Sequence, residues 1–420
     1  MSTPGRLAPD ARHAAITGLG AVTSIGTTLD EIAVALREGR SGVVADDERR
    51  RLGFRSPLTG RIPDFDPRAT GLSRRALRTM GEPAQYAHAA ARAALADASL
   101  DPDGLPAERS GVVFGNDSTV APAVEAIDIA RSSGETHFIG GGHIFRTMNS
   151  TVSMNLATLL GVQGANWTVS AACASSAHAL GQAALLIRSG LQDVVVAGGA
   201  QEMNWESMAS FDALGVFSTR ADDPEGASRP FDADRDGLVP SGGAACLILE
   251  DLEHARARGA CIYAVLRGYG FSSDGSPHLT QPEPRGARRA IGMALHDAQV
   301  SADAVDYINA HATSTVLGDR AEAAAIAELF GSGVPVSSTK SMTGHECWMA
   351  GASELLYTVL MGRHGFLAPN LNFTRFDDDT PAIHVLTETV ACDLGVALSN
   401  SFGFGGTNAA IVLDFGPSTR

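Results

Sequence analysis

One cysteine lies where the sequence pattern is typical of a nucleophile. Cys173 follows an apolar segment, 164–169, that predicts a strand, and it precedes an Ala- and Leu-rich segment, 174–188, that predicts a helix. The first turn of a helix leaves N–H groups unpaired, and its dipole favours negative charge. Such surroundings lower the pKa of a thiol and make it nucleophilic. A lone cysteine is also often a buried structural residue, so this stretch alone supports both interpretations.

Polar residues that could serve a catalytic cysteine follow later strands of the chain. His311 lies just beyond a predicted strand, in a Thr/Ser-rich turn, where α/β proteins bind ligands. Lys340 and His345 share the next strand-to-helix loop, and Glu354 lies on the helix after it. The glycine loop 402–407 could point backbone N–H groups at an anion. A structural histidine, a solvated Lys–Glu pair and an ordinary turn are the alternatives for these features.

Alternating strands and helices must position these groups. Strands are predicted at 14–20, 112–114, 164–169, 193–199 and 244–250, and again at 262–269, 305–310, 334–337, 396–400 and 409–414. Helices are predicted at 29–37, 82–98, 174–188 and 252–258, and again at 286–298, 320–329 and 350–361. The predicted strands are uninterrupted runs of Val, Ile and Ala without alternating polar residues, and such runs are typical of sheets buried on both faces. We therefore predict two α/β halves that meet near residue 255.

Composition narrows the function classes. The 420 residues are 44% hydrophobic and carry a net charge of −15, which argues against general nucleic-acid binding. The five cysteines form no CxxC pair, so we expect reduced thiols and a cytoplasmic protein. Residues 1–12 read as a disordered leader without the apolar core of a secretion signal, and we expect no membrane span.

Taken together, the motifs resemble the β-ketoacyl-acyl carrier protein synthases of the elongating type, and most of all the bacterial type I enzymes. The resemblance covers nearly the whole chain and rests on Ile16–Gly20, Ala171–His178, Arg229–Gly237, Thr343–His345 and Ser399–Asn408. It implies the α/β thiolase fold, in which two similar halves, here 13–255 and 256–420, stack as five alternating α-β-α-β-α layers. It also implies a homodimer.

The resemblance assigns a Cys-His-His catalytic site to Cys173, His311 and His345. Cys173 would accept an acyl group from an acyl carrier protein, and the backbone N–H groups of Cys173 and Phe404 would form the oxyanion hole. Malonyl-carrier protein would then lose carbon dioxide, and both imidazoles would stabilise the enolate that attacks the acyl-cysteine. The family pattern thus implies a decarboxylative Claisen condensation.

Further roles follow from the same resemblance. Lys340 and Glu354 would orient and tune His345. The substrate-binding positions would be Thr313 and Thr315, which match the pantetheine contacts, with Phe402, Ala312, Trp348 and Asp117. We expect no metal and no cofactor, because the phosphopantetheine arrives on the carrier protein.

Three departures from the family pattern put the substrate range in question. Ala312 replaces a glycine and could disfavour a left-handed backbone. Residues 346–349, Glu-Cys-Trp-Met, replace small residues after His345, and Asp117 stands in a normally glycine-rich run. A specialised synthase, of a natural-product pathway or insensitive to an inhibitor, and neutral repacking of a housekeeping enzyme both remain open.

An acidic carrier protein would need a basic surface on this acidic chain. Arg74, Arg75, Arg78 and Arg131 match basic positions of the family and predict such a docking site, although ordinary exposed helices would carry arginines too. A thiolase or initiating synthase would use a second cysteine or an asparagine in place of one histidine. A non-condensing partner subunit, a scaffold and an acyltransferase without condensation remain alternatives.

Overall fold

The strands of the two predicted halves meet edge to edge in one sheet. The computed structural model describes residues 12–63 and 65–416. Its largest sheet has 11 strands, in the order β12 (His384–Val385), β10 (Pro335–Ser337), β9 (Tyr307–Asn309), β14 (Val396–Gly403), β15 (Thr407–Asp414), β8 (Ala264–Ser273), β1 (Ala14–Val22), β7 (Gly243–Asp251), β6 (Val194–Gln201), β4 (Ser110–Gly115) and β5 (Asn166–Val169). The junction between β1 and β8 divides this sheet. On one side lie the five strands of the first half of the chain (β1, β4, β5, β6 and β7), and on the other side lie the six strands of the second half (β8, β9, β10, β12, β14 and β15).

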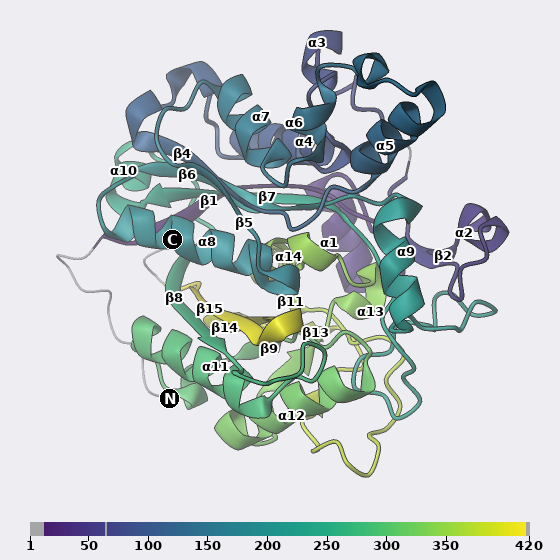
Figure 1. Ribbon diagram of the computed structural model, residues 1–420. Coiled ribbons are helices and arrows are strands. Elements are labelled where there is room, and N and C mark those ends of the chain that lie inside the picture. The colour runs from purple at the N-terminus through teal and green to yellow at the C-terminus, as the bar shows by residue number, and fades with distance from the viewer. Residues whose placement is uncertain (1–11, 64, 417–420) are drawn as a thin grey trace.

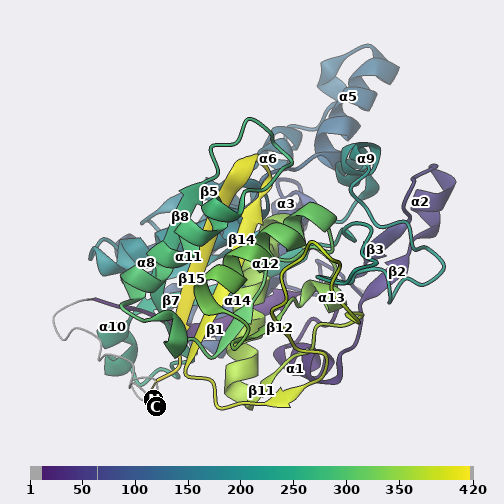
Figure 2. The same cartoon turned by 90° about the horizontal axis from the view of Figure 1, so that it is seen from below.

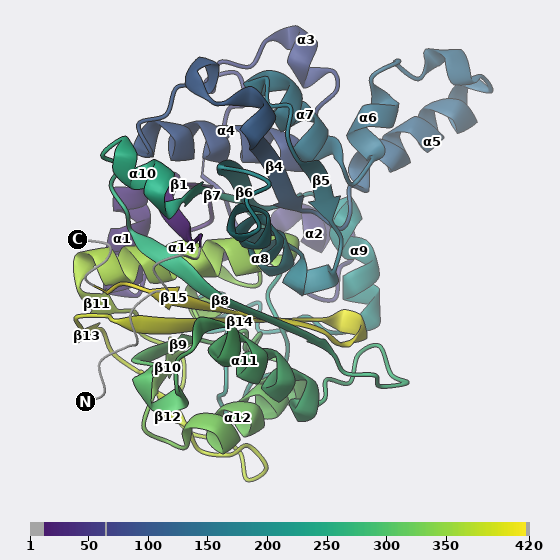
Figure 3. The ribbon, with the colours of Figure 1, turned by 90° about the vertical axis from the view of Figure 1, so that its left-hand side faces the viewer.

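Helices form three layers around the two parts of this sheet (Figures 1 and 3). The outer layer of the first half contains α4 (Glu82–Asp97) and α7 (Thr151–Leu160). The central layer contains α8 (Ser175–Arg188) and α14 (Ala350–His364). The outer layer of the second half, seen in front of the strands in Figure 2, contains α11 (Pro284–Ala298) and α12 (Val316–Phe330). The expected five-layer thiolase fold is confirmed.

The apolar runs of the sequence become strands buried on both faces. Every residue of β1, β6 and β7 is buried, as the continuous Val, Ile and Ala pattern predicts. The strand before Cys173 differs, because β5 is the last strand of the order and Trp167 on it is 40% exposed. Its outer edge has no neighbouring strand within the described residues.

The two halves repeat the same close contact between a strand and a helix. A Cβ added at Gly20 of β1 would lie 2.1 Å from the carbonyl oxygen of Ala90 in α4. A Cβ at Gly270 of β8 would lie 2.0 Å from the carbonyl oxygen of Ala290 in α11. Glycine at both positions lets the helix backbone approach the sheet. The similarity of the two halves therefore extends to individual contacts between a strand and its helix.

Shorter elements connect these layers. They are α1 (Leu29–Glu38), β2 (Val43–Ala45), α2 (Asp47–Arg51), β3 (Leu58–Gly60), α3 (Arg74–Leu77), α5 (Ala121–Ser133), α6 (His143–Thr147), α9 (Trp205–Leu214), α10 (Leu252–Ala257), α13 (Lys340–Thr343), β11 (Phe366–Leu367) and β13 (Val390–Ala391). The predicted division near residue 255 falls within α10. The sequence pattern did not predict α5 or α9, because their apolar residues do not recur at the spacing of three and four residues that marks one face of a helix.

The predicted leader lies almost wholly outside the described residues. Arg12, its last residue, is described, and it forms ion pairs with Asp193 (3.1 Å) and Asp251 (3.2 Å). Two carboxylates thus hold the side chain of the one residue of the predicted leader that the structure describes. Across residues 12–63 and 65–416, no helix combines the length and the apolar character needed to cross a membrane.

We expect Gly20→Ala to destabilise the protein, because its Cβ would overlap backbone atoms of α4. Overpacking of this kind costs about 1–3 kcal/mol. Gly292→Ala in α11 is the matched control: its Cβ would meet no atom within 4 Å, and alanine in a helix stabilises by about 0.5–1 kcal/mol. Urea unfolding followed by circular dichroism measures both changes, and equal stability of the two variants would contradict the close-contact argument.

Candidate active site

A strained turn presents Cys173 between β5 and α8. The preceding residue, Ala172, has φ 45°, in the left-handed region that L-residues rarely adopt. Its N–H donates to Oδ2 of Asp117 over 2.7 Å. The Ser175 hydroxyl donates to the Ala172 carbonyl over 2.6 Å and accepts from the Ala171 N–H over 2.8 Å. Three side-chain hydrogen bonds thus hold the turn that carries the nucleophile.

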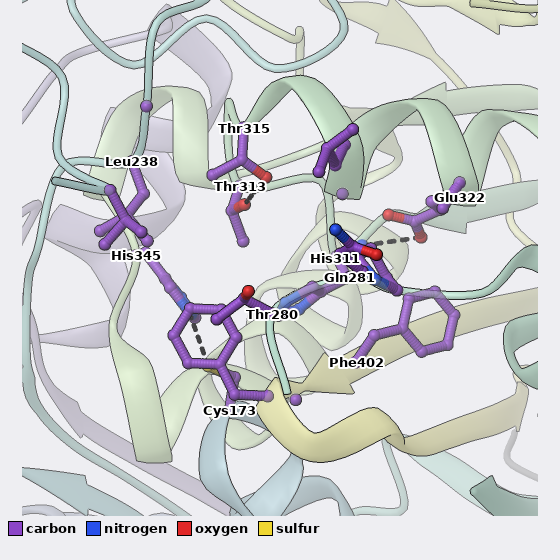
Figure 4. A pocket seen from close by; sticks show the side chains of 18 of the residues that line it. Cys173, Leu238, Thr280, Gln281, His311, Thr313, Thr315, Glu322, His345 and Phe402 are labelled. Carbon is purple, nitrogen blue, oxygen red and sulfur yellow. Dashed lines mark hydrogen bonds between the residues drawn. The ribbon is translucent and has the colours of Figure 1, made fainter. Parts of the chain in front are cut away.

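The structure brings together three side chains from distant parts of the sequence (Figure 4). Nε2 of His345 lies 3.0 Å from Sγ of Cys173. The His311 ring stands edge-on to the His345 ring, with 5.3 Å between centroids and an interplanar angle of 86°. The Phe402 ring packs on the other side of His311, at 5.9 Å. All three predicted catalytic side chains therefore face one point.

Burial controls the protonation states of this cluster. It raises the pKa of the Cys173 thiol to about 12, although the Lys340 charge and the backbone N–H groups of Phe404 and Cys173 act in the opposite direction. The expectation of a lowered thiol pKa is therefore wrong for the free protein, because desolvation outweighs these favourable interactions. Burial, with the Lys340 charge, also holds the pKa of His311 and of His345 well below 6.5. A neutral thiol faces two neutral imidazoles at neutral pH.

The pair of Lys340 and Glu354 is buried, so the solvated alternative is wrong. Both side chains are 1% exposed, and Nζ of Lys340 forms an ion pair with Oε1 of Glu354. Lys340 lies on the short helix α13 just before His345, and Glu354 on the first turns of α14. Lys340 thus acts on the thiol and the imidazoles through its charge.

Glu322 is a positioning residue that the sequence analysis missed. Its carboxylate accepts the backbone N–H groups of His311 (2.9 Å) and Ala312 (2.6 Å), and the amide of Asn400 (2.9 Å). Glu322 is 1% exposed and comes from the buried side of α12, together with Ala325 and Ile326. An acid on the apolar face of a predicted helix was the signal that could have identified it.

Ala312 does not have the backbone conformation for which glycine would be needed. The left-handed residue of this turn is Ser314, with φ 69°, and Ala312 is absent from the residues with positive φ. Its methyl group is buried, and its carbonyl accepts the Ser338 hydroxyl over 2.7 Å. The alanine therefore fits the turn without backbone strain.

A cavity of about 350 Å³ leads to Cys173. Its lining includes the three catalytic side chains, the predicted contacts Thr313, Thr315, Phe402 and Phe404, and the apolar residues Met208, Phe211, Phe217 and Leu238. The Thr313 and Thr315 hydroxyls lie 3.0 Å apart. Ala312, Trp348 and Asp117 were also predicted to contact substrate but do not line this cavity, because they pack into the protein or, for Asp117, hold the Ala172 turn.

Glu346 also points away from the cavity. Its carboxylate accepts the hydroxyls of Ser353 (2.5 Å) and Tyr357 (2.8 Å), both on α14. Burial raises the pKa of Glu346 to about 7 against the effect of these hydrogen bonds. The acid that replaces a small residue after His345 thus belongs to the support of that turn.

The geometry favours proton transfer over metal binding at the three catalytic side chains. Their donor atoms lie within 4.8 Å of one another, close enough to suggest a metal site. A tetrahedral zinc ion, however, would keep a sulfur and a nitrogen ligand about 3.6 Å apart. The 3.0 Å between Sγ and Nε2 is shorter than this and suits a direct hydrogen bond.

The predicted docking arginines lie on the surface. Arg74 and Arg75 are exposed on α3, and Arg78 is the exposed residue that ends this helix. Arg131 lies on α5, where its guanidinium is 4.0 Å from Asp128. The helix α3 has only four residues, but it keeps Arg74 and Arg78 one turn apart.

Comparison with known proteins agrees with this site. The family described as "Beta-ketoacyl synthase, N-terminal domain" matches residues 11–255, and "Beta-ketoacyl synthase, C-terminal domain" matches residues 263–374. The chain belongs to the β-ketoacyl synthase family. It is 42% identical to 3-oxoacyl-[acyl-carrier-protein] synthase 1 of Escherichia coli K12, over 96% of this chain and 98% of that protein. The Haemophilus influenzae protein of the same name is also 42% identical, over the same shares of the two chains.

Solved structures of the family have the same fold. A β-ketoacyl synthase from Burkholderia phymatum superposes with a TM-score of 0.92 at 38% identity, covering 96% of this chain and all of that one. The ishigamide ketosynthase/chain length factor superposes with a TM-score of 0.89 at 33% identity, over 97% of this chain and all of that one. The family resemblance and the enzyme class expected from the sequence are confirmed.

We expect alkylation of Cys173 to accelerate with pH and to show no plateau near neutrality. A thiol with a raised pKa gains thiolate about tenfold per pH unit below that pKa. Iodoacetamide labelling between about pH 6 and about pH 9, read by peptide mass spectrometry, measures this dependence, with the exposed Cys261 as internal reference for the reagent. A rate at Cys173 that levels off near pH 7 would show that the thiolate forms in the free enzyme.

Proposed function

We propose that this protein condenses an acyl group carried on Cys173 with malonyl-carrier protein, releasing carbon dioxide and leaving a β-ketoacyl-carrier protein. The observation that carries the proposal is the hydrogen bond between Cys173 and His345, with His311 beside it, at the end of a cavity. Such a site holds a nucleophile and two hydrogen-bond donors for a developing oxyanion.

In the first half-reaction Cys173 attacks the carbonyl carbon of an acyl thioester. The Nε2–H of His345, 3.0 Å away, donates to the sulfur as the S–C bond forms. The backbone N–H groups of Cys173 and Phe404, which already face the sulfur, stabilise the tetrahedral oxyanion. The Cys173 proton is transferred to the departing pantetheine sulfur, so pantetheine leaves as a thiol and both imidazoles stay neutral.

In the second half-reaction the malonyl thioester lies against His311 and His345. The bond from its α-carbon to the carboxylate breaks, carbon dioxide leaves, and the electron pair forms an enolate. Neutral imidazoles protonated at Nε2 donate to the enolate oxygen, and the low pKa of both rings keeps them in the neutral form that can do so. The enolate carbon attacks the acyl carbonyl, and Cys173 leaves as a thiolate that regains a proton.

The proposed reaction draws its driving force from its substrates. Breaking the thioester and losing carbon dioxide supply the free energy, and no electron is gained or lost overall. The phosphopantetheine arm would enter with the carrier protein, and Thr313 and Thr315 at the cavity wall offer it hydroxyl groups. No bound metal or cofactor is needed in this scheme.

We expect two kinds of macromolecular partner, an acidic carrier protein and a second copy of this chain. The exposed guanidinium groups of Arg74, Arg75, Arg78 and Arg131 would dock an acidic carrier protein. The open edge of β5 would pair with a second copy of the chain, since an unpaired edge with the exposed Trp167 and the nearby Met148 favours association. Solved structures of related ketosynthases contain an acyl-carrier protein or a chain length factor bound to the ketosynthase.

The decisive experiment supplies acyl-carrier protein and malonyl-carrier protein and measures three quantities: acyl loading of Cys173, carbon dioxide release and β-ketoacyl product. We expect Cys173→Ala to lose loading and product. We expect His311→Ala and His345→Ala to lower malonyl-dependent carbon dioxide release by about 10²–10³-fold, because each removes a donor to the enolate oxygen.

The same measurements separate the alternatives. Loading of Cys173 without carbon dioxide release in the wild type would replace this proposal by an acyltransferase reaction. Absence of loading in a folded wild type would favour a partner or scaffold role. The cytoplasmic and homodimeric expectations are tested separately, the second by light scattering of the purified protein.

We expect the double change Arg74→Glu/Arg78→Glu to raise the KM for acyl-carrier protein about tenfold at low salt with little change in kcat, because the charges steer docking. The KM for an acyl-pantetheine without a carrier should not change. Arg288→Glu is the matched charge reversal, since this residue lies on α11 in the opposite outer layer and pairs with Glu328. An equal rise in KM for both substrates would contradict docking at α3.

A further inference from the structure

The acyl group on Cys173 needs a space of its own, and the structure limits where that space can be. In the proposed function the malonyl arm enters the cavity while the acyl group remains on the sulfur, so the acyl tail must lie outside the arm's path. The Cys173 sulfur already contacts Nε2 of His345 and the backbone N–H of Phe404. The apolar cluster that contains Cys173 forms part of the cavity wall, and Trp348 is the buried member of this cluster that lies behind that wall.

This inner cluster consists of Cys173, Met208, Phe217, Leu238, Cys347 and Trp348, with Phe54, Ala172, Phe211 and Val216 packed against it. Trp348 is its largest member and is 6% exposed. The Phe211 ring lies between the Trp348 and Phe404 rings, with centroid distances of 6.1 and 6.3 Å. The indole therefore lies in the same apolar cluster as the nucleophile, packed against Phe211.

A hydrogen bond fixes the indole in this place. Nε1 of Trp348 donates to the Ser118 hydroxyl over 3.0 Å. Ser118 belongs to a loop that is itself fixed: the Asp117 carboxylate accepts the N–H of Ala172, and its carbonyl accepts the Asn149 amide over 3.0 Å. The amide of Asn116 donates in turn to the Asn149 carbonyl over 2.8 Å. Neither the indole nor its partner can shift without breaking these bonds.

We propose that Trp348 is a specificity-determining residue that closes the inner end of the acyl site and restricts Cys173 to short acyl chains. This inference rests on the proposed function. A short acyl group, such as acetyl or butyryl, ends beside Phe211 and Cys347. A longer chain has to displace a buried indole, breaking its bond to Ser118 and its packing against Phe211.

The substitution Trp348→Leu tests the proposal because leucine keeps an apolar contact but removes much of the volume. Wild type and variant receive acetyl-, butyryl-, octanoyl- and palmitoyl-pantetheine, and mass spectrometry of the Cys173 peptide measures the loading rate. We expect the wild type to load acetyl and butyryl at least about tenfold faster than octanoyl and palmitoyl. We expect Trp348→Leu to raise octanoyl loading about tenfold and to leave acetyl loading within about twofold.

Two further variants serve as controls. Trp205→Leu makes the same change at the half-buried first residue of α9, outside the inner cluster, and should keep the wild-type preference. Ser118→Ala removes the acceptor of the indole N–H without opening space and should give a preference between those of wild type and Trp348→Leu. Thermal unfolding by circular dichroism shows that each variant is folded.

The wild-type profile decides the proposal even where Trp348→Leu does not fold. Octanoyl or palmitoyl loading as fast as butyryl loading in the wild type would overturn it, as would an unchanged profile in folded Trp348→Leu. Failure of every acyl group to load on Cys173 would overturn the proposed function as well, so the two failures are distinguishable.

Discussion

The contact between Cys173 and His345 joins the two halves of the chain at the catalytic site. These residues lie 172 positions apart, one in each half of the chain, yet Sγ and Nε2 must stay within hydrogen-bond distance. The central helices α8 and α14 begin just after them and pack against each other. A Cβ at Gly351 of α14 would lie 2.7 Å from the Ala177 Cβ of α8, so a single methyl group at this crossing would push the two turns apart.

The turns that deliver the two residues are alike in geometry and different in chemistry. Ala172 and Cys347 both have φ 45°, and each begins a short 3-10 turn that leads into a central helix. In the first half the next residue is the nucleophile Cys173. In the second half the next residue is Trp348, which packs toward that nucleophile. A duplicated backbone thus supplies the reacting sulfur from one half and the wall beside it from the other.

Burial sets the electrostatics of the site. The free thiol holds its proton because desolvation outweighs the Lys340 charge, and the imidazoles stay neutral for the same reason. Charge therefore develops only when a substrate carbonyl arrives to receive it. The Lys340 charge, paired with the buried Glu354, lowers the pKa of the thiol and of both imidazoles and thus acts on all three catalytic side chains from within the protein.

Local patterns in the sequence predicted the alternating strands and helices and the two-half organisation, because apolar periodicity and glycine turns act over short stretches. The same patterns placed Cys173, His311 and His345 at the ends of strands, but each of them also fitted a structural role, and it was the family resemblance that assigned the three residues to one catalytic site. The strand and helix predictions nearest the site were correct in kind, with ends that differ by a few residues, because caps and packing set the ends.

Roles that depend on contacts between distant segments could not be predicted from the sequence and became visible in the folded chain. The Glu322 carboxylate accepts the backbone N–H of His311, the Asp117 carboxylate accepts the N–H of Ala172, and the Glu346 carboxylate accepts the hydroxyl of Tyr357 on α14. The tertiary structure also reversed the direction predicted for the thiol pKa, because the chemical type of a residue is local while its desolvation depends on everything packed around it. The proposed effect of Trp348 on acyl chain length likewise depends on the side chains that enclose the indole, and its position three residues after His345 does not reveal it.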